Sequence, residues 1–132
     1  MLSITSQSDY GIMLISYLRG KKDFIPLSQL LNQLDLPKRF LARIAALLVK
    51  AGILESREGK VGGYRLTKKA KNLNLYDYLK VFEGELAFVK CQDPDYDCPR
   101  QGYCMHKDFF KHSLTNVLSK ELKKHKLLQI YK

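Results

Sequence analysis

The sequence lacks any long hydrophobic run. No stretch approaches the roughly 18 uncharged apolar residues that a membrane-spanning helix requires. The opening segment 1–6 carries neither the basic region nor the apolar run of a signal peptide. We therefore expect a cytoplasmic protein with no membrane partner.

The sequence also lacks internal repeats, low-complexity segments and the usual signatures of an active site. It contains no phosphate-binding loop, and no pair of carboxylates is set against a nucleophile. Cys104 and His106 form a possible Cys–His pair, but no third residue is in place to orient them. We predict that the protein is not an enzyme and has no small-molecule substrate.

Acidic residues are scarce in this chain of 132 residues. Thirteen Asp and Glu residues stand against 23 Lys and Arg residues, which gives a formal net charge of +10. A small protein this basic is attracted to polyanions such as DNA, although a lysine-rich surface can also serve solubility alone. Much of the excess lies near the C-terminus, at Lys120, Lys123, Lys124, Lys126 and Lys132.

Only three cysteines are present, and Cys91, Cys98 and Cys104 fall within one loop-like segment that contains Asp, Pro and Gly. An odd number of cysteines without an export signal argues against a disulfide framework. Clustered cysteines in a reducing compartment more often form a metal or redox site.

Helical periodicity dominates the rest of the sequence. Apolar residues recur at helical spacing in five segments, and two strand-like segments surround a glycine-rich turn. Ser8 is a suitable N-cap for the first helix, and Gly52 is a suitable cap for the end of the third. The predicted elements are helices over 9–18, 27–34, 37–50, 75–82 and 105–126, with strands over 53–57 and 64–66.

The order of these elements predicts a mainly α fold: a winged helix-turn-helix whose wing is a small β-hairpin. The last helix is long, and little of the domain remains for its apolar stripe to pack against. A second subunit is therefore its natural partner, and we expect a homodimer. The predicted parts are a DNA-binding winged helix-turn-helix domain (1–71), a connecting helix with the cysteine loop (72–104), and a dimerisation helix with a tail (105–132).

Basic residues occupy the two places where a winged helix-turn-helix meets DNA. The second helix of the motif enters the major groove with its N-terminal residues, and there Arg39 and Arg43 share one face. Positive charge also surrounds the glycine turn of the wing, where the backbone can approach DNA closely. Each feature alone also fits an ordinary basic surface. The candidate DNA-binding residues are Lys38, Arg39, Phe40, Arg43, Arg57, Lys60, Gly62, Gly63, Tyr64 and Arg65.

The cysteine spacing favours an inorganic cluster over a single ion. Six residues separate Cys91 from Cys98, and five separate Cys98 from Cys104. Structural zinc sites usually have ligand pairs two to four residues apart, whereas wider gaps let a loop wrap an iron–sulfur cluster. Structural zinc with a nearby histidine, and three free thiols, are the alternatives. The candidates for a fourth ligand are His106, Asp9 and His112.

Four motifs follow one another along the chain before the cysteines. They are Leu2–Thr5 leading to Asp9–Gly11, then Leu36–Leu41, Gly59–Leu66, and Leu75–Leu79 through Phe82–Gly84. Each motif is weak alone. Their joint order, with three cysteines at the expected place, resembles the Rrf2 family of bacterial transcriptional regulators over nearly the whole chain.

The resemblance implies a homodimeric, DNA-binding transcriptional regulator, with repression as the favoured mode, on a roughly two-fold symmetric promoter site. It also implies that Cys91, Cys98 and Cys104 ligate an iron–sulfur cluster whose state tunes DNA binding. Family members sense iron–sulfur supply, iron, nitric oxide or redox state. The rival interpretations are a DNA-binding regulator without a cluster, and a basic protein–protein adaptor that does not touch DNA.

Three departures from the family pattern concern the wing and the cluster ligands. Glu58 stands where the family wing often has Arg, and the first cysteine gap is one residue longer than in the IscR and NsrR patterns. His106 also comes one residue earlier than the IscR-type histidine. By contrast, Asp9 matches the aspartate that completes the NsrR-type cluster from the partner subunit. The resemblance therefore favours Asp9 over His106, and [4Fe–4S] over [2Fe–2S].

Overall fold

The structure, a computed structural model, describes residues 3–131. It is mainly helical with one small antiparallel hairpin, which confirms the predicted fold class. In chain order the elements are α1 (Ser6–Leu18), α2 (Leu27–Leu34), α3 (Lys38–Lys50), β1 (Leu54–Arg57), β2 (Gly63–Leu66), α4 (Lys68–Asn72), α5 (Leu75–Glu83), η1 (Lys90–Gln92), η2 (Phe109–Leu114), α6 (Thr115–Lys124) and η3 (Leu127–Gln129).

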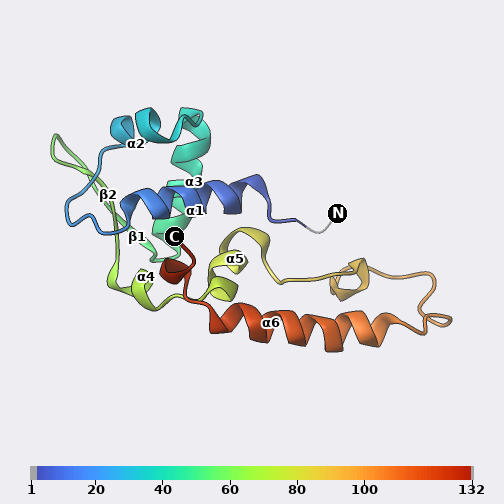
Figure 1. Cartoon of the computed structure of the whole chain (residues 1–132). Coiled ribbons are helices and arrows are strands. Elements are labelled where there is room, and N and C mark those ends of the chain that lie inside the picture. Colours follow the sequence, from blue (N-terminus) through green and yellow to red (C-terminus); the bar gives the residue numbers. More distant parts are fainter. Residues whose placement is uncertain (1–2, 132) are drawn as a thin grey trace.

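Helices α2 and α3 form the helix-turn-helix, and α1 packs against α3 behind it (Figure 1). Asp35 ends α2 in a left-handed conformation with φ of 50°, which a short polar side chain tolerates. The third helix begins at Lys38, one residue later than predicted, and Pro37 is its N-cap with φ of −58° and ψ of 135°. The fully buried core of this head is Leu14, Ile15, Leu30, Leu41, Ile44, Ala45 and Leu48.

The wing is the predicted hairpin, with Leu54 opposite Leu66 and Arg57 opposite Gly63. The segment that follows α1 adds a short third edge to it. Ile25 and Tyr64 exchange two backbone hydrogen bonds of 2.9 Å each, from amide to carbonyl in both directions. The wing is therefore fixed to the loop between α1 and α2 as well as to the core.

The first helix begins at Ser6, not at Asp9 as the sequence predicted. Thr5 is its N-cap, and the Thr5 side chain accepts the amide of Ser8 at 3.4 Å. Ser8 is fully buried within the helix. Its hydroxyl bonds a carboxylate on α5 instead of capping a helix, a long-range contact that local capping rules cannot foresee.

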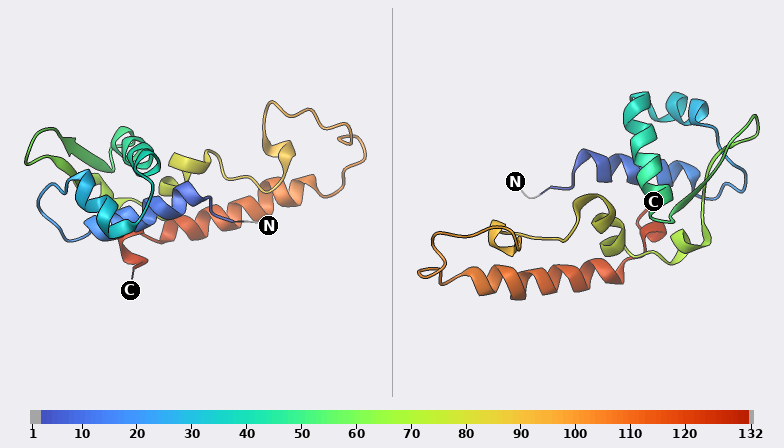
Figure 2. Two further views of the ribbon diagram at one scale, coloured as in Figure 1. Left: turned by 90° about the horizontal axis from the view of Figure 1, so that it is seen from above. Right: turned by 180° about the vertical axis from the view of Figure 1, so that it is seen from behind.

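Residues 85–124 form an arm that projects from the head, at the opposite end from the wing (Figures 1 and 2). A loop carries the cysteines outward, and the last helix returns. That helix runs from Lys107 to Lys124, within the predicted range, and its η2 turn is π-helical. The Thr115 hydroxyl donates to the carbonyl of Phe110 at 2.8 Å at the end of this wide turn. No helix within residues 3–131 combines the length and the apolar character needed to cross a membrane.

After α6 the chain comes back to the head. Leu127 is fully buried in the core, and its amide donates to the carbonyl of Leu73 at 2.8 Å. The Tyr131 hydroxyl donates to the carbonyl of Ile12 on α1 at 2.9 Å. Residues 127–131, near the end of the predicted part 105–132, thus pack against the head.

Candidate DNA-binding surface and cysteine site

The recognition helix α3 presents a cationic outer face. Lys38, Arg39 and Arg43 are exposed, while the opposite side of the helix lies in the core. Phe40 is half-buried and packs edge-to-face on Tyr10 of α1, with 5.3 Å between ring centroids. The three cationic side chains are free to reach a nucleic acid, and Phe40 holds the helix to the head.

The wing residues divide into exposed charges and packed backbone. Lys60 is exposed at the hairpin turn, and Arg57 is exposed at the end of β1. Arg65 is half-buried and forms an ion pair with Glu55 across the hairpin. Part of the predicted positive charge of the wing is therefore neutralised within the wing.

The two wing glycines leave room for the protein's own backbone. A Cβ atom at Gly62 would overlap the carbonyl of Arg57, and one at Gly63 would overlap the carbonyl of Ile25. Gly63 also has a φ of 139°, which disfavours a side chain. Tyr64 is the residue that pairs with Ile25. Gly62 and Gly63 therefore let the protein backbone pack closely within the wing and against the loop before α2.

The three cysteines surround a common space on the arm. Cys91, Cys98 and Cys104 are free and half-buried. All three line a cavity of about 600 Å³ and a second one of about 200 Å³. Within residues 3–131, no three His, Cys, Asp or Glu side chains are close enough to hold one metal ion. The thiols therefore line an open cavity and do not converge on a point.

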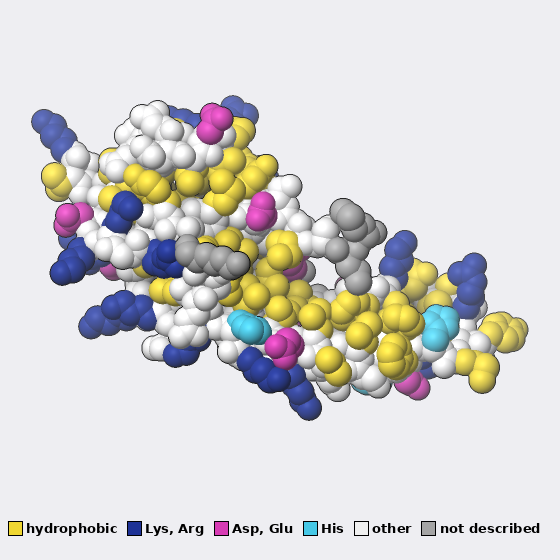
Figure 3. Space-filling view, viewed as in Figure 1, with side chains coloured by type: hydrophobic (Ala, Val, Ile, Leu, Met, Phe, Trp, Pro, Cys, Tyr) yellow, Lys and Arg dark blue, Asp and Glu magenta, His cyan; other side chains and the backbone are white. Residues whose placement is uncertain are grey.

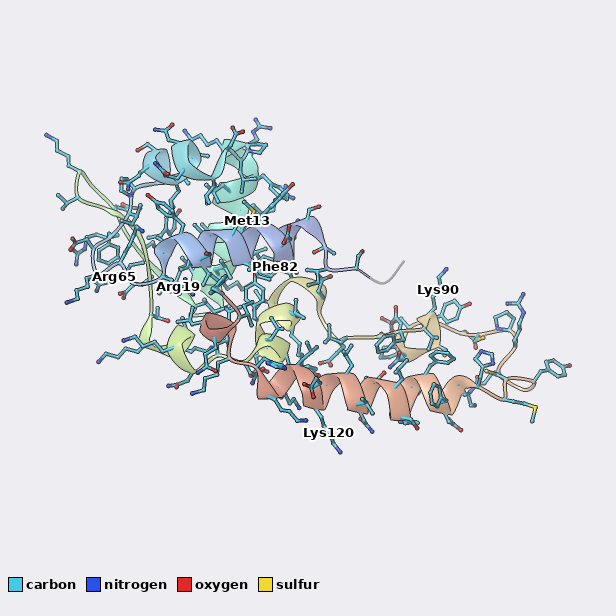
Figure 4. The ribbon with its side chains drawn as sticks, viewed as in Figure 1. Met13, Arg19, Arg65, Phe82, Lys90 and Lys120 are labelled. Carbon is cyan, nitrogen blue, oxygen red and sulfur yellow. The ribbon has the colours of Figure 1, made fainter. Side chains whose placement is uncertain are left out.

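The larger cavity combines apolar and cationic walls. Tyr96 and Tyr103 lie beside the thiols, and Lys90 (labelled in Figure 4), Arg100 and Lys107 also line it. Cationic side chains offset the negative charge that thiolates and a thiolate-bound inorganic core carry. The chemistry of the wall suits an anionic, sulfur-ligated group.

The candidate fourth ligands lie in different places. His106 lines the larger cavity, and its Nδ1 and Nε2 atoms are each 3.8 Å from the Cys104 Sγ atom. His112 lines the smaller cavity. Asp9 is exposed in the first turn of α1 and lines neither cavity. Within one chain, the structure brings His106 and His112 to the cysteines but not Asp9.

Comparison with protein families identifies the chain. A family model described as "Rrf2: Iron-dependent Transcriptional regulator" matches residues 4–132. The chain belongs to the Rrf2 family. Rrf2 proteins are DNA-binding transcriptional regulators and not enzymes, in agreement with both predictions from the sequence.

Curated and solved Rrf2 relatives match most of the chain. The HTH-type transcriptional regulator NsrR of Halalkalibacterium halodurans is 27% identical over 120 residues, 89% of this chain and 82% of that protein. CymR (YrzC), the global cysteine regulator of B. subtilis, has the same fold with a TM-score of 0.72 at 20% identity, covering 98% of this chain and 96% of that one. T. potens IscR also has this fold, with a TM-score of 0.67 at 20% identity, covering 98% of this chain and 85% of that one.

Gln92 is a site residue that sequence reasoning missed in this Rrf2 protein. Its Oε1 atom accepts the amides of Phe88 at 2.6 Å and Val89 at 3.2 Å, and its Nε2 atom donates to the Thr115 Oγ1 atom at 2.9 Å. Gln92 follows Cys91 directly, so these bonds fix the start of the cysteine loop against the arm helix. No local signal marks it, because Thr115 lies far along the chain.

Glu83 is a second residue that sequence reasoning missed, at the junction of head and arm. Its Oε1 atom accepts hydrogen bonds from the hydroxyls of Ser8 at 2.5 Å and Thr5 at 2.7 Å, and from the Thr5 amide at 3.1 Å. Burial raises the pKa of Glu83, but these hydrogen bonds outweigh burial and lower the pKa below its ordinary value. The ionised carboxylate joins the start of α1 to the end of α5, where the arm begins.

Proposed function

We propose that this Rrf2 protein binds promoter DNA as a homodimer and that an iron–sulfur cluster modulates the binding. The observation that carries the proposal is the placement of three free thiols around one cavity on the arm. The family description as an iron-dependent regulator also supports it.

The residues on the arm fit such a cluster by their chemistry. Cys91, Cys98 and Cys104 would be the thiolate ligands, because soft sulfur donors select iron–sulfur clusters. Asp9 of a second copy is the favoured fourth ligand, with His106 of the same chain as the alternative. When bound, the cluster supplies iron that responds to redox state, nitric oxide or iron supply. [4Fe–4S] is the favoured form of the cluster, with [2Fe–2S] as the alternative.

The arm helix offers a face for a second copy. Phe109, Val117 and Leu118 are 57%, 65% and 37% exposed. Figure 3 shows hydrophobic side chains gathered along the arm on the face in view. Pairing two such faces would remove apolar surface from water and would present two recognition helices to two half-sites of one promoter.

Regulation then follows from the connections between arm and head. The Gln92 hydrogen bonds hold the cysteine loop to the arm helix, and Glu83 holds the root of the arm to α1. When its three thiolates bind the cluster, the cysteine loop is held in one conformation. That conformation favours one orientation of the head relative to the arm. A coupling of about 1–3 kcal/mol would change DNA affinity roughly 5- to 150-fold, with repression as the favoured outcome.

A second candidate is a regulator whose thiols act without a cluster. The fold is shared with CymR, which is named a global cysteine regulator, and the three thiols are free and half-buried. Structural zinc is less favoured, because no two of the cysteines have the spacing of two to four residues that is usual for zinc ligand pairs.

The test is anaerobic purification of the wild type and of a variant in which all three cysteines become serine. We expect brown wild-type protein with iron, sulfide and visible absorption, and a colourless variant as stable to heat as wild type from which the cluster has been removed. Wild-type binding to selected genomic fragments should change by about fivefold or more on oxidation, and binding by the variant should not. If the wild type contains no iron but its DNA binding still changes on oxidation, the thiol candidate would be supported. Equal binding by wild type and variant under all conditions would refute both.

A further inference from the structure

Three charged side chains share one face of the wing hairpin. Glu55 and Arg57 are two residues apart on β1, so they point to the same side. Arg65 is the cross-strand partner of Glu55 and lies on that side as well. This face of the hairpin therefore carries two guanidinium groups and one carboxylate.

The ring of Phe24 lies against both guanidinium groups. The Arg57 Cζ atom is 4.3 Å from the ring centroid and the Arg65 Cζ atom is 4.2 Å from it. Both distances fall well inside the range of cation–π contacts. One aromatic side chain from the loop between α1 and α2 thus contacts both arginines of the wing.

The position of Phe24 is fixed by its neighbour in the chain. Ile25 is paired to Tyr64 through two backbone hydrogen bonds, and the absence of a side chain at Gly63 lets the Ile25 carbonyl approach the wing. The ring is therefore anchored to the same hairpin whose arginines it contacts.

The two arginines differ in how much of their charge remains available. Arg65 is ion-paired with Glu55, and its Nη1 atom also donates to the carbonyl of Lys22 at 3.4 Å. Its side chain lies at the base of the hairpin (Figure 4). Arg57 forms no ion pair within residues 3–131 and is exposed. Arg57 is the guanidinium that a ligand of the wing can use.

We infer that Phe24 is a positioning residue that holds Arg57 ready for a DNA phosphate. The inference rests on the proposed DNA binding. An arginine side chain loses much rotamer freedom when it binds, and a contact that restricts it beforehand lowers that cost. Arg65, which is restrained by its ion pair with Glu55, contacts the same Phe24 ring and helps to hold it in place. The partner is a DNA phosphate, because contacts to the DNA backbone position a protein on the duplex without reading its base sequence.

The test measures binding of the full chain to a random-sequence duplex, since a phosphate contact needs no operator. The variants are Phe24→Leu, Phe24→Tyr, Arg57→Ala and the double variant Phe24→Leu/Arg57→Ala. Phe24→Leu should weaken binding about two- to fivefold per wing, and Phe24→Tyr, which keeps the ring, should bind like wild type. With Arg57→Ala already present, Phe24→Leu should cause no further loss.

Salt dependence separates this role from a purely structural one. Arg57→Ala should make the slope of log affinity against log salt shallower by about 0.9 for each phosphate that the wing no longer neutralises. Phe24→Leu should keep the wild-type slope, because the arginine still reaches its phosphate. All variants should unfold cooperatively, with midpoints lowered by no more than a few degrees, as the loss of cation–π contacts of about 0.5–1 kcal/mol each implies.

Two outcomes would overturn the inference. One is wild-type affinity in Phe24→Leu. The other is an equal loss from Phe24→Leu with and without Arg57, which would assign Phe24 to the general shape of the wing. Failure of the wild type to bind any duplex at low salt would refute the proposed function instead.

Discussion

At the scale of single residues, the Glu83 carboxylate is a pH-dependent joint between α1 and α5. The pKa of Glu83 is lower in the folded protein than its ordinary value of 4.5. A group with a lowered folded pKa contributes stability that is fully present above the unfolded pKa. That contribution is lost as the pH falls through the folded pKa. The Glu83 carboxylate should therefore stabilise the contact between α1 and α5 at neutral pH and less so in acid.

Replacing Glu83 with Gln should reduce the free energy of unfolding at neutral pH. It should also make that free energy depend less on pH in the acid range. Gln keeps an acceptor oxygen but removes the charge that strengthens the bonds from Ser8 and Thr5. Because the site is partly exposed, we expect a loss of up to about 1 kcal/mol near pH 7 that vanishes towards pH 3. Thermal unfolding across this pH range measures it.

Glu85→Gln is the matched control for that prediction. Glu85 is exposed and pairs with Lys80 on the surface, where an ion pair contributes little. Its stability difference from wild type should be small at every pH. A Glu83→Gln profile that parallels the wild type down to acid pH would show that the carboxylate does not hold α1 to α5.

At the scale of elements, the contact between α1 and α5 depends on the absence of a side chain at Gly11. A Cβ atom there would overlap the Tyr78 hydroxyl and would lie 3.1 Å from the Cζ atom of Phe82, labelled in Figure 4. Tyr78 has no room to move, because it is fully buried and its hydroxyl donates to the carbonyl of Ser8 at 2.6 Å. Burial also raises the pKa of Tyr78, so the hydroxyl stays protonated.

Gly11→Ala should therefore destabilise the protein although alanine is the better helix former. The helix gains about 1 kcal/mol, but overpacking typically costs about 1–3 kcal/mol, and the Tyr78 hydrogen bond is strained as well. We expect a net loss of about 1–2 kcal/mol in chemical unfolding. Gly102→Ala, where a Cβ would meet nothing within 4 Å, is the control and should be neutral. A more stable Gly11→Ala protein would contradict this packing.

The elements that the sequence predicted are those determined by residues close to one another in the chain. Apolar periodicity located α1, α2, α3, α5 and the arm helix but not the short α4, and the glycine turn located the wing to within a residue. The π-helical turn η2 and the docking of Leu127 escaped prediction, since both depend on partners distant in sequence. The same holds within the site. Residue type and spacing marked the cysteines, whereas Phe24 and Gln92 act through contacts that only the fold creates.

At the scale of the whole molecule, the wing and the cysteine arm occupy opposite ends (Figure 2). Several contacts tie arm and head together, among them the packing of α6 against α5. Glu83 holds the root of the arm to α1, and the tail after α6 returns to the core through Leu127. A change in the cysteine loop can therefore reach the recognition helix through α5 and α1, which both pack against α3.

The proposed dimer makes a direct prediction for Val117. A glutamate at this exposed apolar position would place a charge inside the paired arm faces, where an unpaired charge is costly to bury. We expect Val117→Glu to run as a monomer in light scattering at concentrations where the wild type is a dimer. Its operator affinity should fall by at least about tenfold, because the second half-site no longer adds to binding.

Asn116→Glu provides the control, since it adds the same charge to an exposed polar position on the same helix. That variant should remain dimeric, and both variants should keep the wild-type unfolding profile at low protein concentration, where dimers contribute little to stability. If Val117→Glu stays dimeric and binds its operator like wild type, the two copies do not meet through this face of the arm. The hydrophobic side chains along it would then require a different partner.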